Sequence, residues 1–123
     1  MVFKELLVWQ KAMDLVEEVY KISAFLPKEE TFSLAAQIKR AAVSVPSNIA
    51  EGNSRNSIKE YINFLGIARG SNSEVYTQLL ICVRLGYVKE EHIYKASLLS
   101  EEIAKMINAM IIKLSNKSGG KKE

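Results

Sequence analysis

A proline inside an otherwise helical pattern constrains the fold of this chain more than any other feature. Apolar residues recur at helical spacing on both sides of Pro46, next to a stripe of polar residues. Pro46 has no amide hydrogen and its ring crowds the carbonyl of Ala42, so we expect a kink in a helix that continues through it. The side chains of Ser44, Ser47 and Asn48 are placed to satisfy the freed backbone groups.

The rest of the chain also shows helical periodicity. Apolar stripes at three- and four-residue spacing predict helices over residues 6–26, 31–52, 57–84 and from residue 90 onward. Thr31 is the expected cap of the second helix, Ser57 and Glu60 form a capping box for the third, and Gly86 follows its end. We therefore predict an all-α, antiparallel up-down four-helix bundle over residues 1–115 with a kinked second helix, followed by a disordered basic tail at 116–123.

The charge is unevenly distributed along the chain. Residues 1–112 carry 13 Lys and Arg against 13 Asp and Glu, so the formal charge of +3 comes from the four lysines of residues 113–123 set against Glu123. Residues 37–88 nevertheless hold six cations and three anions, which predicts a local positive face. The candidate nucleic-acid contacts are Lys39, Arg40, Arg55, Lys59, Arg69 and Arg84.

The sequence offers no pattern for catalysis. The single Cys82 lies in an apolar run, and the single His92 has no glutamate at the spacing that di-iron bundles use. Phosphate-binding glycine loops and nucleophile motifs are absent. No segment has the pattern of a secretion signal or a membrane span. We expect a cytoplasmic protein that is not an enzyme, contacts no membrane and uses no cofactor, metal or small-molecule substrate.

Two groups of side chains are candidates for packing roles. A polar cluster is expected to fix helix register around a buried arginine between carboxylates, with ligand or nucleic-acid contact as the alternative; its members are Gln37, Arg40, Asn48, Glu51 and Glu74. A row of small side chains predicts close approach of another helix, from the same chain or from another subunit; its members are Gly66, Gly70, Ser73 and Thr77. This small-residue row and the wide apolar face of the fourth helix favour self-association.

Several motifs together resemble a known bacterial four-helix bundle family. They are Leu7 to Ala12, Gln37 to Gly52 with the proline block, Glu60-Tyr61, Phe64-Leu65, Ala68, Gly70-Ser71, Glu74 and Leu85 to Tyr87. The family includes large-subunit rRNA intervening-sequence proteins and accessory variability proteins of diversity-generating retroelements. The resemblance implies a cytoplasmic homopentamer. The retroelement members of the family bind nucleic acid and a reverse transcriptase through a basic surface.

Two functional hypotheses follow from these observations. The first is an oligomeric accessory protein that binds RNA or DNA through the six cations, with the tail lysines adding nonspecific attraction. The second is a scaffold that binds another protein and no nucleic acid. The zero net charge of residues 1–112 keeps both hypotheses open.

Overall fold

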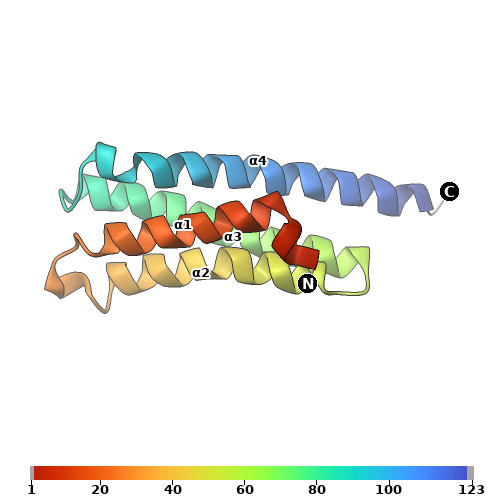
Figure 1. Cartoon of the computed structure of the whole chain (residues 1–123), viewed down its shortest axis with the longest axis horizontal. Helices are drawn as coiled ribbons and strands as arrows, with labels where there is room; N and C mark the ends of the chain where they lie inside the picture. The colour runs from red at the N-terminus through yellow and green to blue at the C-terminus, as the bar shows by residue number, and fades with distance from the viewer. Residues whose placement is uncertain (1, 122–123) are drawn as a thin grey trace.

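A computed structural model describes residues 2–121 of the chain, with side chains described through Ser118. Within that part, four α-helices follow one another in an antiparallel bundle, together with two short 3-10 helices (Figure 1). The elements are η1 Val2–Glu5, α1 Leu7–Ser23, η2 Lys28–Glu30, α2 Leu34–Asn53, α3 Ile58–Arg84 and α4 Glu90–Lys121. The predicted all-α four-helix bundle is confirmed.

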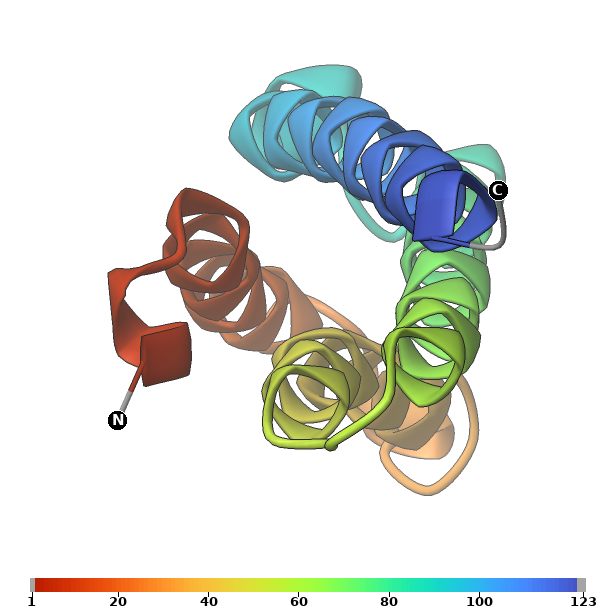
Figure 2. The same cartoon turned by 90° about the vertical axis from the view of Figure 1, so that its right-hand side faces the viewer.

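Each helix packs against the next along the chain, and α4 packs back against α1 (Figure 2). Two ion pairs accompany the antiparallel contact between α1 and α4. Lys11 Nζ lies 2.9 Å from Glu102, and Lys95 Nζ lies 3.5 Å from Glu18. This four-sided arrangement turns the apolar stripes of all four helices towards one interior.

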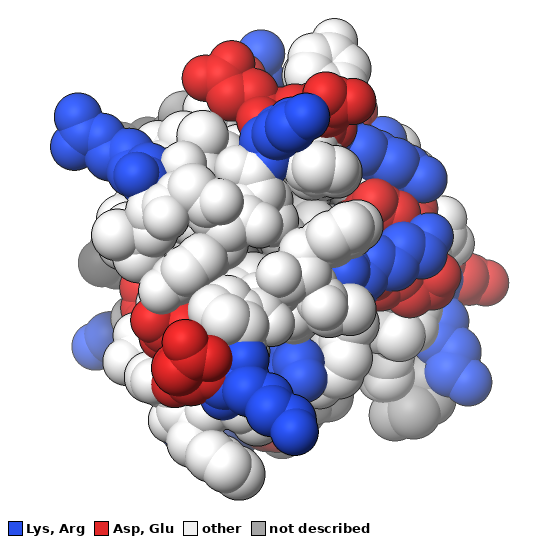
Figure 3. Space-filling view, turned by 90° about the vertical axis from the view of Figure 1, so that its left-hand side faces the viewer, with Lys and Arg blue, Asp and Glu red and all other residues white. Residues whose placement is uncertain are grey.

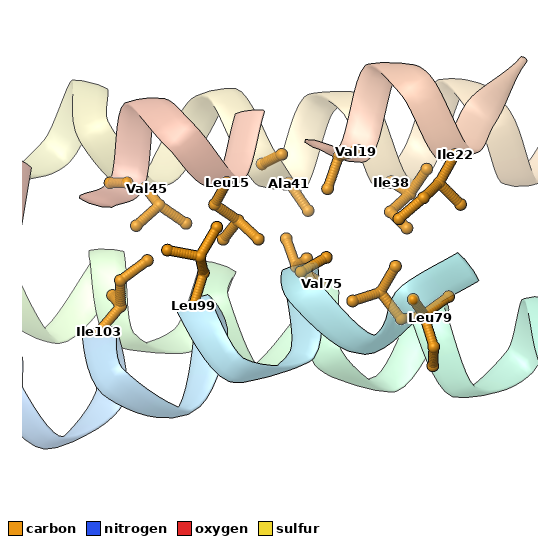
Figure 4. Packing of buried hydrophobic residues seen from close by; sticks show 14 of the residues in the cluster. Leu15, Val19, Ile22, Ile38, Ala41, Val45, Val75, Leu79, Leu99 and Ile103 are labelled. Atoms are coloured by element: carbon orange, nitrogen blue, oxygen red, sulfur yellow. The ribbon is translucent and has the colours of Figure 1, made fainter. Parts of the chain in front are cut away.

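The interior is filled by aliphatic side chains from every helix. Leu15 of α1, Val45 of α2 and Ile103 of α4 are fully buried and point towards one another (Figure 4). Leu79 of α3 fills the interior further along the bundle and is also fully buried. Removing such a side chain from water stabilises the fold by about 1.5–3 kcal/mol each. The apolar periodicity of the sequence therefore identified the residues that hold the bundle together.

Local signals at both ends of α3 act largely as predicted. Ser57 Oγ accepts a 3.0 Å hydrogen bond from the Glu60 amide, which forms one half of the capping box. The Glu60 carboxylate lies instead 3.6 Å from Arg55. At the other end Gly86 adopts φ of 76°, a conformation that glycine adopts without strain. The amides of Gly86 and Tyr87 then close the helix in a Schellman motif, by donating to the carbonyls of Val83 and Cys82 at 2.9 and 3.0 Å.

The start of α2 differs from the prediction. Thr31 does not cap the helix, because it lies two residues before the N-cap position and instead ends η2, where its amide donates to the Lys28 carbonyl at 3.1 Å. The helix begins at Leu34, whose amide donates to the Glu30 carboxylate at 3.3 Å. A carboxylate thus supplies the acceptor that a threonine hydroxyl was expected to supply.

α2 continues through Pro46 without a break, and Pro46 itself is buried. Ser47 Oγ donates to the Val43 carbonyl and Asn48 Nδ2 donates to the Ser44 carbonyl, both at 2.8 Å. Neither bond reaches the Ala42 carbonyl, which Pro46 leaves without its amide donor, so these bonds do not confirm that the side chains satisfy the freed group. The kink at Pro46 stays a prediction.

The last helix is longer than the sequence indicated. Residues 116–121, expected to belong to a disordered tail, continue α4 to Lys121, and residues 122–123 lie outside the described part. A helix that is already formed gains one hydrogen bond for each residue that it adds, so it extends beyond the packed core when no proline stops it. Figure 1 shows the end of α4 projecting past the other helices. Within residues 2–121 no helix has an apolar stretch long enough to cross a membrane.

Candidate functional surfaces

A polar groove of about 350 Å³ runs between α2 and α3. It is lined by Gln37, Arg40, Ala41, Ser44, Ser71, Glu74 and Gln78. Three members of the predicted polar cluster, Gln37, Arg40 and Glu74, are therefore brought together in one groove. The antiparallel contact of α2 with α3 explains this, since it places the middle of one helix beside the middle of the other.

The buried arginine expected between carboxylates is not present. Arg40 is exposed, and within the described residues no carboxylate lies within 4.0 Å of it. Glu51 pairs with Arg55 at 2.9 Å, one helical turn further along α2. Asn48 Nδ2 donates to Ser44 Oγ at 2.9 Å. Helical spacing places the cluster residues of α2 on one stripe. Glu51 and Asn48, however, each bind a partner one turn away on the same helix and do not contact Arg40.

Other polar side chains make the hydrogen bonds that join neighbouring helices. Ser44 and Ser71 share a 2.8 Å hydrogen bond across α2 and α3. Asn72 of α3 donates to the Ser100 carbonyl of α4 at 2.9 Å, and Ser100 Oγ donates back to Asn72 Oδ1 at 3.0 Å. Asn72 is 2% exposed and Ser100 is 1% exposed. Sequence reasoning missed this reciprocal pair, although both residues sit on apolar helical stripes where a polar side chain signals a buried partner.

The six candidate cations do not form one positive face. Lys39 Nζ lies 5.1 Å from the centre of the Tyr20 ring, on the side of α1. Arg69 donates to Asn108 Oδ1 at 3.0 Å, on the side of α4. These contacts direct the two cations towards different neighbouring helices.

Arg55 is held by several groups at the turn between α2 and α3. It pairs with Glu51 and Glu60, and its guanidinium lies 4.8 Å from the centre of the Phe64 ring. The other three candidates, Arg40, Lys59 and Arg84, are exposed and have no ion pair or aromatic contact within the described residues. Of the six candidates, these three remain available for an external anion.

The end of the bundle that carries η2 and the turn between α3 and α4 has charges of both signs. Figure 3 shows lysine and arginine interspersed with acidic side chains around an uncharged centre. Mixed charges of this kind give no strong field of one sign. This end of the molecule therefore adds no positive patch to the three available cations.

The small-residue row lies on the outer side of α3 and is open to solvent. A Cβ atom built on Gly66 or on Gly70 would meet no neighbour within 4 Å, and Ser73 and Thr77 are exposed. The close approach of a helix from the same chain is therefore wrong. Three large apolar side chains on α3 are exposed beside the row: Ile67 at 51%, Leu80 at 47% and Ile81 at 37%. Packing against another subunit stays a prediction.

The two side chains most often used in catalysis, Cys82 and His92, lie in environments that suit a structural role. Cys82 is fully buried, and burial raises the pKa of its thiol, which disfavours the reactive thiolate. His92 Nδ1 accepts a 2.9 Å hydrogen bond from the Lys89 amide at the start of α4. The described residues contain no group of three His, Cys, Asp or Glu side chains that could hold a metal ion.

A second polar contact joins the two connections at one end of the bundle. Tyr87 donates a 2.8 Å hydrogen bond to the Glu30 carboxylate, which also accepts the amide of Leu34. The Tyr87 bond, followed by the Leu34 bond, lowers the pKa of Glu30 below 4.5 because both favour the charged form. The same bond raises the pKa of Tyr87. Its position beside the caps of α2 and α3 gives this contact a structural role.

Together these features define a helical bundle protein whose candidate functional groups lie on its surface. The model of one family, described as 23S rRNA-intervening sequence protein, matches residues 4–109, and the chain belongs to that family. A solved structure from Bacteroides thetaiotaomicron, a protein of unknown function from the S23 ribosomal protein family, is 27% identical with a TM-score of 0.79. The match covers 85% of this chain and 98% of that one. A search of curated proteins found no match.

Proposed function

We propose that this protein is a non-enzymatic, RNA-associated accessory protein that acts in the cytoplasm as a homo-oligomer. Membership of the rRNA intervening-sequence family supports an association with RNA. The observation that carries the proposal is the outer face of α3, where the open small-residue row lies between exposed apolar side chains and has a cation beyond each end.

Self-association explains why this face is smooth and apolar. Gly66 and Gly70 let a second helix approach closely, and the flanking Ile67, Leu80 and Ile81 would be buried in that contact. A complementary surface lies between α1 and α2, where an apolar groove of about 420 Å³ includes the exposed Met13 and Val43. α1 and α3 lie on opposite sides of the bundle (Figure 2), so the two surfaces face different ways. Head-to-tail contacts close into a ring when the rotation between neighbouring subunits closes, and a ring of five would fit the homopentamer that the family resemblance implies.

The cations at the ends of the small-residue row provide the proposed RNA contacts. Lys59 and Arg84 lie about seven turns apart on the same side of α3, a distance of roughly 38 Å. One such pair binds a phosphate backbone weakly, because each contact contributes only a salt-dependent term. A ring repeats the pair in every subunit and thereby raises the affinity without any new type of contact.

Fluorescence anisotropy of a labelled structured RNA, titrated with nucleic-acid-free protein at several salt concentrations, tests the proposal. We expect sub-micromolar binding at low salt and a steep loss of affinity as salt rises. Lys59→Ala with Arg84→Ala should weaken binding and reduce the salt dependence. Lys4→Ala with Lys28→Ala removes the same charge elsewhere and should have a smaller effect. Equal losses in the two double variants would refute the assignment to α3.

The self-association half of the proposal has its own measurement. Light scattering should give an oligomeric mass, and Gly70→Leu, which fills open space within one subunit, should reduce that mass without loss of helicity. A monomer at micromolar concentration would refute the assembly. RNA binding by such a monomer would leave the other half of the proposal standing.

A protein-interaction scaffold is the second candidate. It is favoured by the internal contacts of Lys39, Arg55 and Arg69, which occupy half of the candidate cations. The absence of RNA binding even at low salt would support the scaffold. A reverse transcriptase as partner, implied by the retroelement members of the resemblance, stays a prediction without support from the comparisons.

A further inference from the structure

An apolar groove lies at the end of the bundle opposite to η2. It is lined by Leu6, Leu7, Val8, Tyr61, Met106, Ala109, Met110, Lys113 and Leu114, and its volume is about 490 Å³. The groove exists because α1 begins at Leu7 whereas α4 continues past it and crosses towards α3 (Figure 2). The inner side of the last turns of α4 is therefore left without a helix to cover it.

The dimensions of the groove fit a helix. Met106, Met110, Lys113 and Lys117 follow one another on one stripe of α4 that extends over roughly 16 Å, or about three helical turns. Methionine side chains adapt to varied apolar partners, and Leu7 on the opposite wall is 56% exposed. An amphipathic helix laid in such a groove places its own apolar stripe against these residues.

The charge of the groove determines which kind of helix it accepts. Between residues 103 and 121, α4 carries Lys105, Lys113, Lys117 and Lys121 and no acidic residue. Lys113 lines the groove, Lys117 lies one turn further on, and neither has an ion pair within the described residues. Lys11 on α1, by contrast, is already paired with Glu102. Unpaired lysines along an apolar groove favour a partner with carboxylates beside its apolar stripe.

We propose that this groove binds an acidic amphipathic α-helix of a partner protein. The apolar stripe of that helix packs between Leu7 and Met110, and its carboxylates pair with Lys113 and Lys117. This site shares no residue with the proposed RNA contacts on α3. The proposal therefore stands or fails independently of RNA binding.

Two designed peptides of 16 residues test the proposal with the full chain. Both carry leucine at positions i, i+3, i+4 and i+7; one has glutamate and the other has lysine beside the leucine stripe. By anisotropy at low salt, the glutamate peptide should bind at least tenfold more tightly than the lysine peptide. Lys113→Glu with Lys117→Glu should weaken the glutamate peptide at least tenfold and reverse the preference. Lys28→Glu with Lys89→Glu, the matched change at the other end of the bundle, should leave the preference unchanged.

A second variant tests the apolar part of the site. Leu7→Ala should weaken the glutamate peptide several-fold with little change in stability, because the leucine side chain is more than half exposed. Three results would overturn the proposal. They are no peptide binding at millimolar concentration, equal affinity for both peptides, and a lower oligomeric mass of Leu7→Ala, which would show that a second copy occupies the groove. Loss of RNA binding in Lys113→Glu with Lys117→Glu, together with no peptide binding, would assign the lysines to RNA.

Discussion

The buried pair of Asn72 and Ser100 should make α3 and α4 depend on each other for stability. Two hydrogen bonds of 2.9 and 3.0 Å join the residues at a site where both are almost fully buried. In Ser100→Ala the Oδ1 atom of Asn72 loses its donor and gains no water in exchange. An orphaned buried acceptor costs about 1–3 kcal/mol, so we expect the free energy of unfolding to fall by that amount.

The double variant separates this pair from simple loss of packing. In the Asn72→Ala background the Ser100 hydroxyl has already lost its acceptor, so Ser100→Ala should then cost about 0.5 kcal/mol or less. The two changes should therefore show a coupling energy of about 1 kcal/mol or more. Residues that merely fill space near one another, without a shared hydrogen bond, would show a smaller coupling.

Urea unfolding followed by circular dichroism measures these free energies, with the protein concentration held constant because self-association adds to apparent stability. Ser97→Ala is the matched control on the same helix. Ser97 is partly exposed and has no side-chain hydrogen bond in the described structure, so its loss should change stability by about 0.5 kcal/mol at most. Single-variant costs that add to within about 0.5 kcal/mol in the double variant would refute the reasoning.

Three further predictions concern the ends of the helices. Gly52→Val should destabilise the fold by about 1–3 kcal/mol in urea unfolding, because a Cβ atom would lie 2.8 Å from Phe64 Cβ; an unchanged unfolding midpoint would contradict that close approach. Ser57→Ala should cost about 1 kcal/mol in the same assay through loss of the cap on α3, and a loss below about 0.3 kcal/mol would show that the cap is not needed. In an NMR pH titration the pKa of the Glu30 carboxyl should lie below the ordinary value for glutamate, and Tyr87→Phe should move it upward. Because the folded-state pKa of Glu30 is lowered, its contribution to stability is present above the unfolded-state pKa and is lost as the pH falls through the folded-state value. A Glu30 titration that is insensitive to Tyr87→Phe would contradict the assigned cause.

The fold could be predicted because its signals are local. The helical periodicity of apolar residues and the capping residues identify α3 from Ser57 to Gly86. The same apolar stripes contain the residues that are buried in the core. The start of α2 could not be predicted in this way, because the η2 turn and the bond from Leu34 to Glu30 depend on how two short segments fold back. A residue that is able to cap a helix indicates a boundary only when it directly precedes the first helical residue, and here the η2 turn leaves Thr31 two residues before the N-cap position.

The candidate surfaces were less predictable. A helical stripe shows which face of the helix a side chain lies on, but not how far it lies from side chains of other helices. Gln37, Arg40 and Glu74 do line one groove, but not as the predicted cluster around a buried arginine. The sequence could not show that Arg55 would take Glu51 at 2.9 Å, which leaves Arg40 exposed and without an ion pair in the described structure. The small-residue row raises the same difficulty. Its spacing indicates a close neighbour, but only the packed chain shows that this neighbour is not one of its own helices.

The two proposed sites are linked through charge although they share no residue. Lys113 and Lys117 contribute to the excess of +3 that attracts a phosphate backbone over a long range, and carboxylates of a bound helix would cancel it. An acidic helix in the groove should therefore weaken RNA binding at low salt, and RNA should weaken binding of the helix by the same factor. Screening shortens this interaction to about 8 Å at physiological ionic strength, whereas Lys59 and Arg84 lie roughly 38 Å apart along α3. Lys59 lies two residues from Tyr61 in the groove, so the bound acidic helix should weaken phosphate binding at Lys59. Phosphate binding at Arg84 should not change. The partner would thus reduce RNA affinity at one end of α3 without displacing RNA from the other.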